Sequence, residues 1–154
     1  MTKIRIALYH PDLKQDFVRL NVDWLEEFFF VEPVDEMVLN QCEQKIIAPG
    51  GHIFFLLRDN TVLGTVALMK TEEGVFELTK MSVDKTLRGK GYGKTLLQHC
   101  IDFAKRRSWK KLILYSNTKL ENAIHLYQKF GFCEIPVEAG CVYERCNIKM
   151  ELLF

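Results

Sequence analysis

The chain has 154 residues, of which 48% are hydrophobic and 27% are charged. This length and composition predict a single globular domain over residues 1–154 and exclude a disordered or coiled-coil protein. The formal net charge of +1 argues against a nucleic-acid partner. Without a leader-like N-terminus or an apolar run of membrane-spanning length, we expect a cytoplasmic protein that has no membrane partner.

The first third of the chain predicts one strand and two helices. Residues 4–9 form an apolar, β-prone run that ends at His10. Apolar residues then recur at helical spacing over residues 12–32 and again over residues 34–47. The expected buried stripes are Leu13, Phe17, Leu20, Trp24 and Phe28 in the first helix and Met37, Val38, Cys42 and Ile46 in the second.

Six acidic residues lie within these two predicted helices: Asp23, Glu26, Glu27, Glu32, Asp35 and Glu36. Two interpretations are open. The first, which we favour, is a solvated helix surface; the second is an acidic mouth that attracts a cationic substrate.

The middle of the chain predicts three strands, over residues 53–57, 62–69 and 75–83. Turn signals separate them at residues 59–60 and 72–74, and both connections are short. We therefore expect an antiparallel meander.

A glycine-rich loop follows the third of these strands, with the pattern R-x-x-G-x-G from Arg88 to Gly93, and an amphipathic helix begins there. The free N–H groups and positive dipole end of such a helix bind phosphate, and Lys90 and Lys94 add charge. A P-loop would need glycine in place of Arg88, and a dinucleotide fingerprint would need glycine in place of Lys94. Both of these motifs are therefore excluded.

The last third predicts a helix that ends near residues 105–107, a strand over 111–116 and a helix over 120–130. A short strand over residues 132–135 follows. Alternating apolar residues then predict one long strand over 142–152.

Cysteine and histidine give no sign of a disulfide framework or a metal site. The five cysteines are odd in number and contain no C-x-x-C pair, which is typical of reduced thiols. The four histidines lack the spacing of metal ligands, so we expect no metal. The residues concerned are Cys42, Cys100, Cys133, Cys141, Cys146, His10, His52, His99 and His125.

Two motifs together resemble those of the GNAT superfamily of N-acetyltransferases. The loop from Arg88 to Gly93 is similar to the family's pyrophosphate loop, Q/R-x-x-G-x-G/A, and A-I-H-L-Y-Q-K-F-G-F at residues 123–132 is similar to its A-x-x-L-Y-x-K-x-G-F segment. The resemblance covers nearly the whole chain and is most specific over residues 77–132. It implies an α/β fold, the GNAT acyl-CoA N-acyltransferase fold. This is a mixed, mostly antiparallel twisted sheet of about six or seven strands, flanked by about four helices.

Three further patterns resemble bacterial GNAT domains that are also found fused to MarR-type regulators. They are L-T-K-M-S-V from Leu78, S-N-T-K-L from Ser116, and Y-x-R-x-N from Tyr143. No winged-helix pattern precedes them, so we expect this chain to lack the regulator.

The resemblance implies a site for acetyl-CoA as a co-substrate. A splayed strand near Met81 is expected to offer free backbone N–H groups to the pantetheine arm and to the thioester carbonyl. At the position of the family's usual asparagine this chain has Leu120, so a neighbouring asparagine is expected to take over that contact. The expected binding residues are Met81, Ser82, Val83, Arg88, Gly89, Lys90, Gly91, Tyr92, Gly93, Lys94, Asn117 and Asn122.

Two side chains are implied as catalytic. Glu77 matches a strand glutamate that serves the family as general base, often through water, and its apolar neighbours favour a raised pKa. An exposed glutamate paired with a lysine is an equally good interpretation. Tyr127 matches the tyrosine that protonates the departing thiolate; packing of an aromatic ring against the sheet is the alternative that we favour less.

The implied function is transfer of an acetyl group from acetyl-CoA to the primary amine of a small molecule, amino acid or peptide, by direct attack in a ternary complex. The alternative is a non-catalytic acyl-CoA-binding sensor or scaffold. Transfer through Cys100 or Cys133 is disfavoured because neither has a base at a diagnostic offset. The acceptor is expected near Trp24, Phe29, Phe30, Tyr143 and Arg145. A homodimer through residues 28–30 is also considered.

Overall fold

The computed structural model describes residues 3–154, so the first two residues of the expected domain 1–154 lie outside the described part. The helices and strands are β1 (Ile4–Leu8), α1 (Lys14–Phe28), α2 (Pro33–Asn40), β2 (His52–Arg58), β3 (Thr61–Glu72), β4 (Val75–Val83), α3 (Tyr92–Arg106), β5 (Lys111–Ser116), α4 (Glu121–Lys129), β6 (Cys133–Ile135) and β7 (Ile148–Leu153). Shorter helical turns are η1 (Pro11–Leu13), η2 (Glu43–Ile47) and η3 (Lys85–Leu87). Within residues 3–154, no helix is long and apolar enough to cross a membrane.

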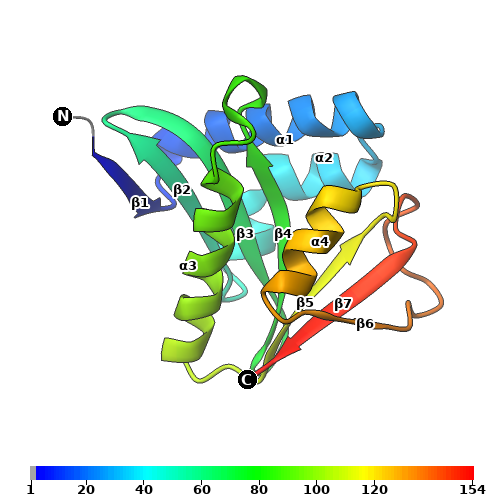
Figure 1. Ribbon diagram of the computed structural model, residues 1–154. Coiled ribbons are helices and arrows are strands. Elements are labelled where there is room, and N and C mark those ends of the chain that lie inside the picture. The colour runs from blue at the N-terminus through cyan, green and yellow to red at the C-terminus, as the bar shows by residue number, and fades with distance from the viewer. Residues whose placement is uncertain (1–2) are drawn as a thin grey trace.

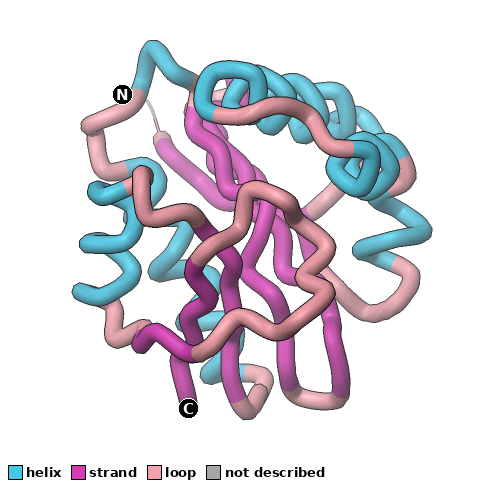
Figure 2. Tube along the Cα trace, turned by 90° about the vertical axis from the view of Figure 1, so that its right-hand side faces the viewer, coloured by secondary structure: helices cyan, strands magenta, loops and turns pink. Residues whose placement is uncertain are grey.

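The seven strands form one sheet in the order β1-β2-β3-β4-β5-β7-β6. Neighbouring strands are antiparallel except for β4 and β5, which are parallel. Helices α1 and α2 cover one face of the sheet, and α3 and α4 cover the other (Figures 1 and 2). The expected mixed, mostly antiparallel sheet and the meander of β2, β3 and β4 are confirmed.

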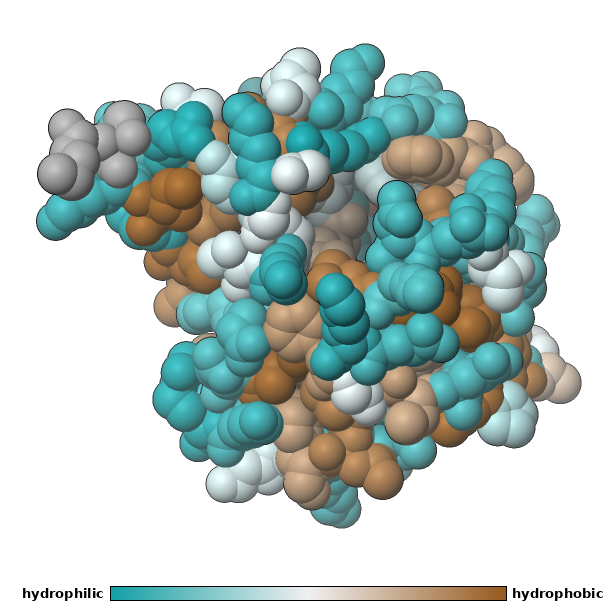
Figure 3. All heavy atoms as spheres, in the orientation of Figure 1, coloured by the Kyte–Doolittle hydropathy of each residue, from teal (hydrophilic) through white to brown (hydrophobic). Residues whose placement is uncertain are grey.

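Strand β2 shows how the sequence pattern builds a core on each side of the sheet. Phe54 and Leu56 belong to the core beneath α3, whereas Ile53, Phe55 and Leu57 belong to the core beneath α1 and α2. Successive side chains of a strand point to opposite faces, so a strand that is covered on both faces needs an uninterrupted apolar run. The face of the molecule shown in Figure 3 carries many hydrophilic side chains, with hydrophobic side chains showing between them.

The long last strand predicted over residues 142–152 is wrong in its first half. Strand β7 begins only at Ile148, and Val142 is 65% exposed. The segment over residues 141–147, called the 141–147 loop below, is irregular, and two of its alternating side chains bond across the molecule: Tyr143 to Glu77 of β4 and Arg145 to Asp35 of α2.

The second predicted helix, over residues 34–47, is also interrupted. Helix α2 ends at Asn40, and the π-helical turn η2 begins at Glu43. Cys42 and Ile46 are fully buried as predicted, but Met37 is 41% exposed and does not belong to the buried stripe. The backbone therefore changes from α-helical to π-helical geometry after Asn40, and Cys42 and Ile46 remain in the core.

Candidate active site

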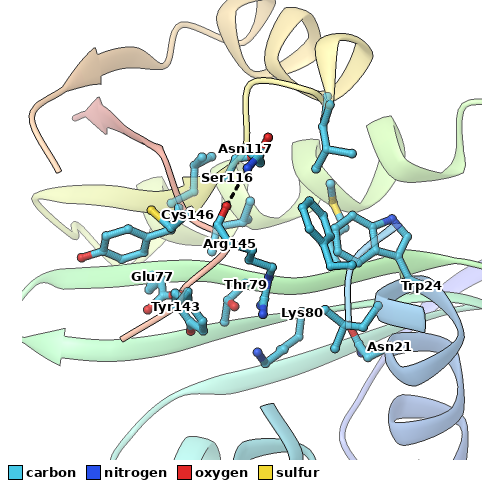
Figure 4. A pocket seen from close by; sticks show the side chains of 18 of the residues that line it. Asn21, Trp24, Glu77, Thr79, Lys80, Ser116, Asn117, Tyr143, Arg145 and Cys146 are labelled. Atoms are coloured by element: carbon cyan, nitrogen blue, oxygen red, sulfur yellow. Dashed lines mark hydrogen bonds between the residues drawn. The ribbon is translucent and has the colours of Figure 1, made fainter. Parts of the chain in front are cut away.

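Strands β4 and β5 separate in the middle of the sheet. They pair only from Val75 with Lys111 to Glu77 with Ile113, although β4 continues to Val83. A pocket of ≈ 160 Å³ lies in this opening, lined by residues of α1, β4, β5, α4 and the 141–147 loop (Figure 4). Backbone groups of β4 beyond Glu77 thus have no strand partner on the β5 side, as the resemblance implies for the region of Met81.

A β-bulge at Lys80 turns the polar side chains of β4 toward α1 and α2. The pairing of β4 with β3 shifts between Thr79 and Ser82, and Lys80 has a φ of 54°. A left-handed φ is uncommon for a residue with a side chain, and bulges of this kind re-aim side chains near functional sites. Because of the extra residue, Glu77 and Ser82 face the same side of the sheet although they are an odd number of positions apart.

Glu77 lies at the end of the paired region, where its side chain is 8% exposed. The hydroxyl of Tyr143 donates a hydrogen bond of 3.0 Å to Glu77 Oε2. Burial raises the pKa of the Glu77 carboxyl, and the hydrogen bond from Tyr143 and the positive charge of Lys80 offset only part of this rise. The alternative of an exposed strand glutamate is therefore wrong.

A buried ionic network lies beside Glu77. Arg145 Nη1 is 2.8 Å from Glu32 Oε2 and 2.7 Å from Asp35 Oδ2, and Arg145 Nη2 is 2.9 Å from Asp35 Oδ1. Lys80 Nζ is 2.7 Å from Asp35 Oδ1, and the backbone N–H of Glu144 donates to Glu32 Oε1 at 2.9 Å. These charge-assisted bonds tie the start of α2 to the bulge of β4 and to the loop that precedes β7.

The network determines the charge state of its members. Burial alone would raise the pKa of Asp35, but the hydrogen bonds from Arg145 and the charge of Lys80 outweigh it, so the pKa is lowered. Burial lowers the pKa of Lys80, against the attraction of Asp35. Two basic side chains, Lys80 and Arg145, thus lie against two acidic ones, Glu32 and Asp35.

Both sequence interpretations of the acidic group are wrong for two of its members, because Glu32 is 3% and Asp35 is 0% exposed. They form neither a solvated surface nor an open acidic mouth. Their pattern does carry a signal: Glu32 and Asp35 form a capping box at the start of α2, around Pro33. Lys80 was not among the predicted site residues, and its only signal is that it is a second charged residue, beside Glu77, in a mainly apolar strand.

Tyr127 reaches the pocket from α4, on the other side of the opening. The side chain is half-buried and lines the pocket, and its ring centroid is 5.9 Å from that of Phe132. Burial raises the pKa of Tyr127 to about 12, so its hydroxyl keeps its proton at neutral pH. The residue thus packs against the core and also lines the pocket.

The glycine loop leads directly into α3. Gly91 is the N-cap of this helix, with a φ of 84°, and no side chain caps the helix start. The first intrahelical hydrogen bond runs from the N–H of Thr95 to the carbonyl of Gly91 at 3.1 Å. The N–H groups of Tyr92, Gly93 and Lys94 precede it, so these three residues belong to the first turn of the helix and not to the loop.

The cations of this region differ in their surroundings. Lys90 and Lys94 are exposed. Arg88 instead turns toward α1, where its Nη1 is 2.7 Å from Glu27 Oε2, and Tyr92 accepts a hydrogen bond from Arg58. Among residues 3–154, Lys90 in the loop and Lys94 in the first turn of α3 therefore have no ion-pair partner, whereas Arg88 is paired.

Other predicted binding residues separate into those at the pocket and those away from it. Met81 and Asn117 line the pocket, and Asn117 Nδ2 donates to the carbonyl of Arg145 at 2.7 Å. Ser82 is buried and donates from its hydroxyl to the carbonyl of Leu20 at 2.8 Å. Val83, which precedes the turn η3, lies in a second depression. Asn122 is exposed and is not among the residues that line the pocket.

The acceptor side predicted from the sequence agrees largely with the pocket, which Trp24, Phe29, Tyr143 and Arg145 line. In Figure 4, Glu77 and Tyr143 lie together at one end and Trp24 at the other. Phe30 is 54% exposed and does not line the pocket.

Neither Cys100 nor Cys133, the two cysteines considered as nucleophiles, contributes an activated thiol to the pocket. Cys100 is fully buried, and burial raises the pKa of its thiol, which makes a thiolate unfavourable. Cys133 is exposed on β6, away from the residues that line the pocket. Among the residues described here, no group of three or more histidine, cysteine, aspartate or glutamate side chains is placed to hold a metal ion.

Comparison with known proteins identifies the family. The family model described as "Acetyltransferase (GNAT) family" matches residues 17–132, and the chain therefore belongs to the GNAT family of acetyltransferases. The N-acetylaspartate synthetase of Rattus norvegicus is 37% identical over 93 residues, which cover 58% of this chain and 31% of that protein. The uncharacterised N-acetyltransferase YjgM of Escherichia coli (strain K12) is 28% identical over 111 residues, covering 69% of this chain and 66% of that protein. The match thus spans about a third of the N-acetylaspartate synthetase.

Solved structures agree on the fold. A GNAT-family acetyltransferase from Staphylococcus aureus Mu50 has a TM-score of 0.85 at 22% identity, over 97% of this chain and 98% of that chain. The PaiA N-acetyltransferase from Thermoplasma acidophilum, solved in complex with coenzyme A, has a TM-score of 0.78 at 17% identity, over 99% of each chain. The GNAT fold expected from the sequence is confirmed, and the likeness to domains fused to MarR-type regulators stays a prediction.

Proposed function

We propose that this chain is an acetyl-CoA-dependent N-acetyltransferase, which transfers the acetyl group to a primary amine by direct attack in a ternary complex. The observation that carries the proposal is the pocket at which β4 and β5 separate, because Glu77 and Tyr127 both line it. A candidate base and a candidate acid thus approach one space from different elements, as the chemistry of amide formation from a thioester needs.

The glycine loop suits the diphosphate of acetyl-CoA. The first N–H groups of α3 and the exposed Lys90 and Lys94 offer hydrogen bonds and positive charge. No atom lies within 4 Å of the place where a Cβ on Gly91 would stand, which leaves the loop open on that side. Arg88 joins this site only if it exchanges Glu27 for the diphosphate. We retain Asn117 over Asn122 for the pantetheine contact because only Asn117 lines the pocket.

In the proposed mechanism, Glu77 accepts the proton of the attacking amine, directly or through water. Its raised pKa suits a base that works near neutral pH. Backbone N–H groups of β4 beyond Glu77 donate hydrogen bonds to the oxygen that becomes negative in the transition state. Tyr127 donates its proton to the departing thiolate, and its raised pKa of about 12 keeps that proton available. Acetyl-CoA supplies the activated acyl group.

The acceptor is an amine of a small molecule, amino acid or peptide. The N-acetylaspartate synthetase of Rattus norvegicus bears the name of an acetylated amino acid, and 93 of its residues align with this chain at 37% identity. Aspartate therefore comes first among the amines to be tried.

The test is calorimetric titration with acetyl-CoA, followed in the same sample by thiol release on addition of an amine panel. Micromolar binding with amine-dependent release supports the proposal. Binding without release by any amine favours the alternative, a non-catalytic sensor or scaffold that keeps the glycine loop. Failure to bind acetyl-CoA or coenzyme A overturns both functions.

A further inference from the structure

The charges that face the pocket are mainly positive. Among residues 3–154, the charged side chains that line it are Glu77, Lys80 and Arg145. The carboxylates that pair with the two cations, Glu32 and Asp35, are buried and do not line it. The pocket wall therefore contains Lys80, whose side chain is 3% exposed, and Arg145, whose side chain is 16% exposed, and their counter-charges lie behind the wall.

Both cations have donors left over. Arg145 uses three N–H groups on Glu32 and Asp35, two from Nη1 and one from Nη2. A guanidinium group has five such donors, and an ammonium group has three. Lys80 makes one side-chain hydrogen bond, to Asp35. Each cation thus retains donors for a further acceptor group, without any loss of its structural partner.

The base lies close to this pair. The positive charges of Lys80 and Arg145 both act on the Glu77 carboxyl, and all three side chains line the same pocket. In Figure 4, Lys80 lies between Glu77 and Tyr143 at one end and Asn21 and Trp24 at the other. When the amine of a small molecule lies against Glu77, a neighbouring group of that molecule therefore lies near Lys80 and Arg145.

The same wall disfavours a polycationic acceptor. A polyamine would bring additional ammonium groups next to Lys80 and Arg145, and like charges placed in a buried site repel each other strongly. The pocket of ≈ 160 Å³ is also smaller than the roughly 300–1,000 Å³ of sites for drug-sized ligands. Charge and size together favour a small acceptor with a negative group.

We infer that the acceptor is a small amine that carries a carboxylate, such as a free amino acid, and that Lys80 and Arg145 bind this carboxylate. The inference rests on the proposed acetyl transfer and narrows its substrate class. The carboxylate positions the amine at Glu77, so Lys80 and Arg145 determine specificity and take no part in proton transfer.

The first test compares acids with their amides on the wild-type protein. Glycine and glycinamide, alanine and alaninamide, aspartate and spermidine are titrated into the protein saturated with coenzyme A, and the same amines are assayed for thiol release from acetyl-CoA. We expect each acid to bind at least about 10-fold more tightly than its amide, which is the effect of one hydrogen-bonded charge pair. The amides are the less basic amines, so a preference for the acids does not arise from amine availability.

The second test uses Lys80→Gln with Lys111→Gln as its matched control. Lys111 pairs with Glu151 at 3.0 Å and does not line the pocket. K80Q is expected to weaken binding of the acids about 10-fold and to leave the amides and acetyl-CoA unchanged. K111Q should change none of these affinities. If Lys80 had only a structural role, K80Q would weaken the binding of acids and amides alike.

The outcomes separate this inference from the proposed function. Thiol release with amides or spermidine at least as fast as with acids overturns the carboxylate site and leaves the acetyltransferase intact. Selective binding of acids without any thiol release supports the carboxylate site and overturns the acetyl transfer. Absence of both binding and release overturns both.

Discussion

The hydroxyl of Tyr143 donates a 3.0 Å hydrogen bond to Glu77 Oε2, across 66 positions of sequence. This contact lowers the pKa of a carboxyl that burial raises. If Glu77 is the base, kcat/KM rises with pH as the carboxyl loses its proton. E77Q should remove this dependence and reduce kcat/KM by about 10²-fold or more. Glu73→Gln, at an exposed position, is the control, and an unchanged pH profile in E77Q would assign the base elsewhere.

Removal of the hydroxyl alone gives a finer test. In Tyr143→Phe, Glu77 loses a bond that favours its charged form, so its pKa rises further. We expect the acidic limb of the pH–rate profile to move to higher pH, with little loss of rate at alkaline pH. A uniform loss at every pH would show instead that Tyr143 acts through packing.

Tyr127→Phe should lower kcat by about 10²-fold and leave the affinity for acetyl-CoA nearly unchanged, because the ring still fills its place beside Phe132. Single-turnover thiol release and calorimetry measure the two quantities. Tyr9→Phe is a matched control, since the hydroxyl of Tyr9 bonds to Glu43 away from the pocket. Wild-type kcat in Y127F would remove Tyr127 from the mechanism.

Gly93→Ala separates folding from diphosphate binding. A Cβ at Gly93 would come no closer than 3.9 Å to Val83, and in a helix alanine is favoured over glycine by about 1 kcal/mol. The free protein should therefore be as stable as wild type or more so. If the diphosphate approaches this backbone, affinity for acetyl-CoA falls about 10-fold or more, whereas wild-type affinity would place the diphosphate elsewhere.

Asp35→Asn should destabilise the protein by about 3–5 kcal/mol in urea unfolding at neutral pH, because it leaves Lys80 and Arg145 without their shared counter-charge. Glu36→Gln, exposed in the same turn of α2, should cost little. The folded-state pKa of Asp35 is lowered from the usual value of 3.8, so its contribution is complete above that pH and is lost as the pH falls through the folded-state pKa. D35N should lack this acid-dependent part.

Local patterns predicted most of the fold. The strands β2, β3 and β4, the glycine loop and the start of α3 each depend on residues within a few positions of one another, and Glu77 and Tyr127 stand in recognisable motifs. The ionic network was not predictable in this way, because Arg145 meets Glu32 and Asp35 across 113 and 110 positions. A pattern of alternating residues in one segment carries no information about partners so far away. Arg145 bonds to these distant partners, and the prediction of a strand from residue 142 was therefore wrong.

Because Arg145 lies so far along the chain from Glu32 and Asp35, it is synthesised well after them. Strand β4, the glycine loop and α3 are contiguous in sequence, and all three precede Arg145. Until Arg145 has emerged, Asp35 and Lys80 lack their third partner, and the side of the pocket that would hold the amine does not exist. Under the proposed function, a nascent chain that ends before residue 145 lacks one of the two cations that would bind the carboxylate of the acceptor.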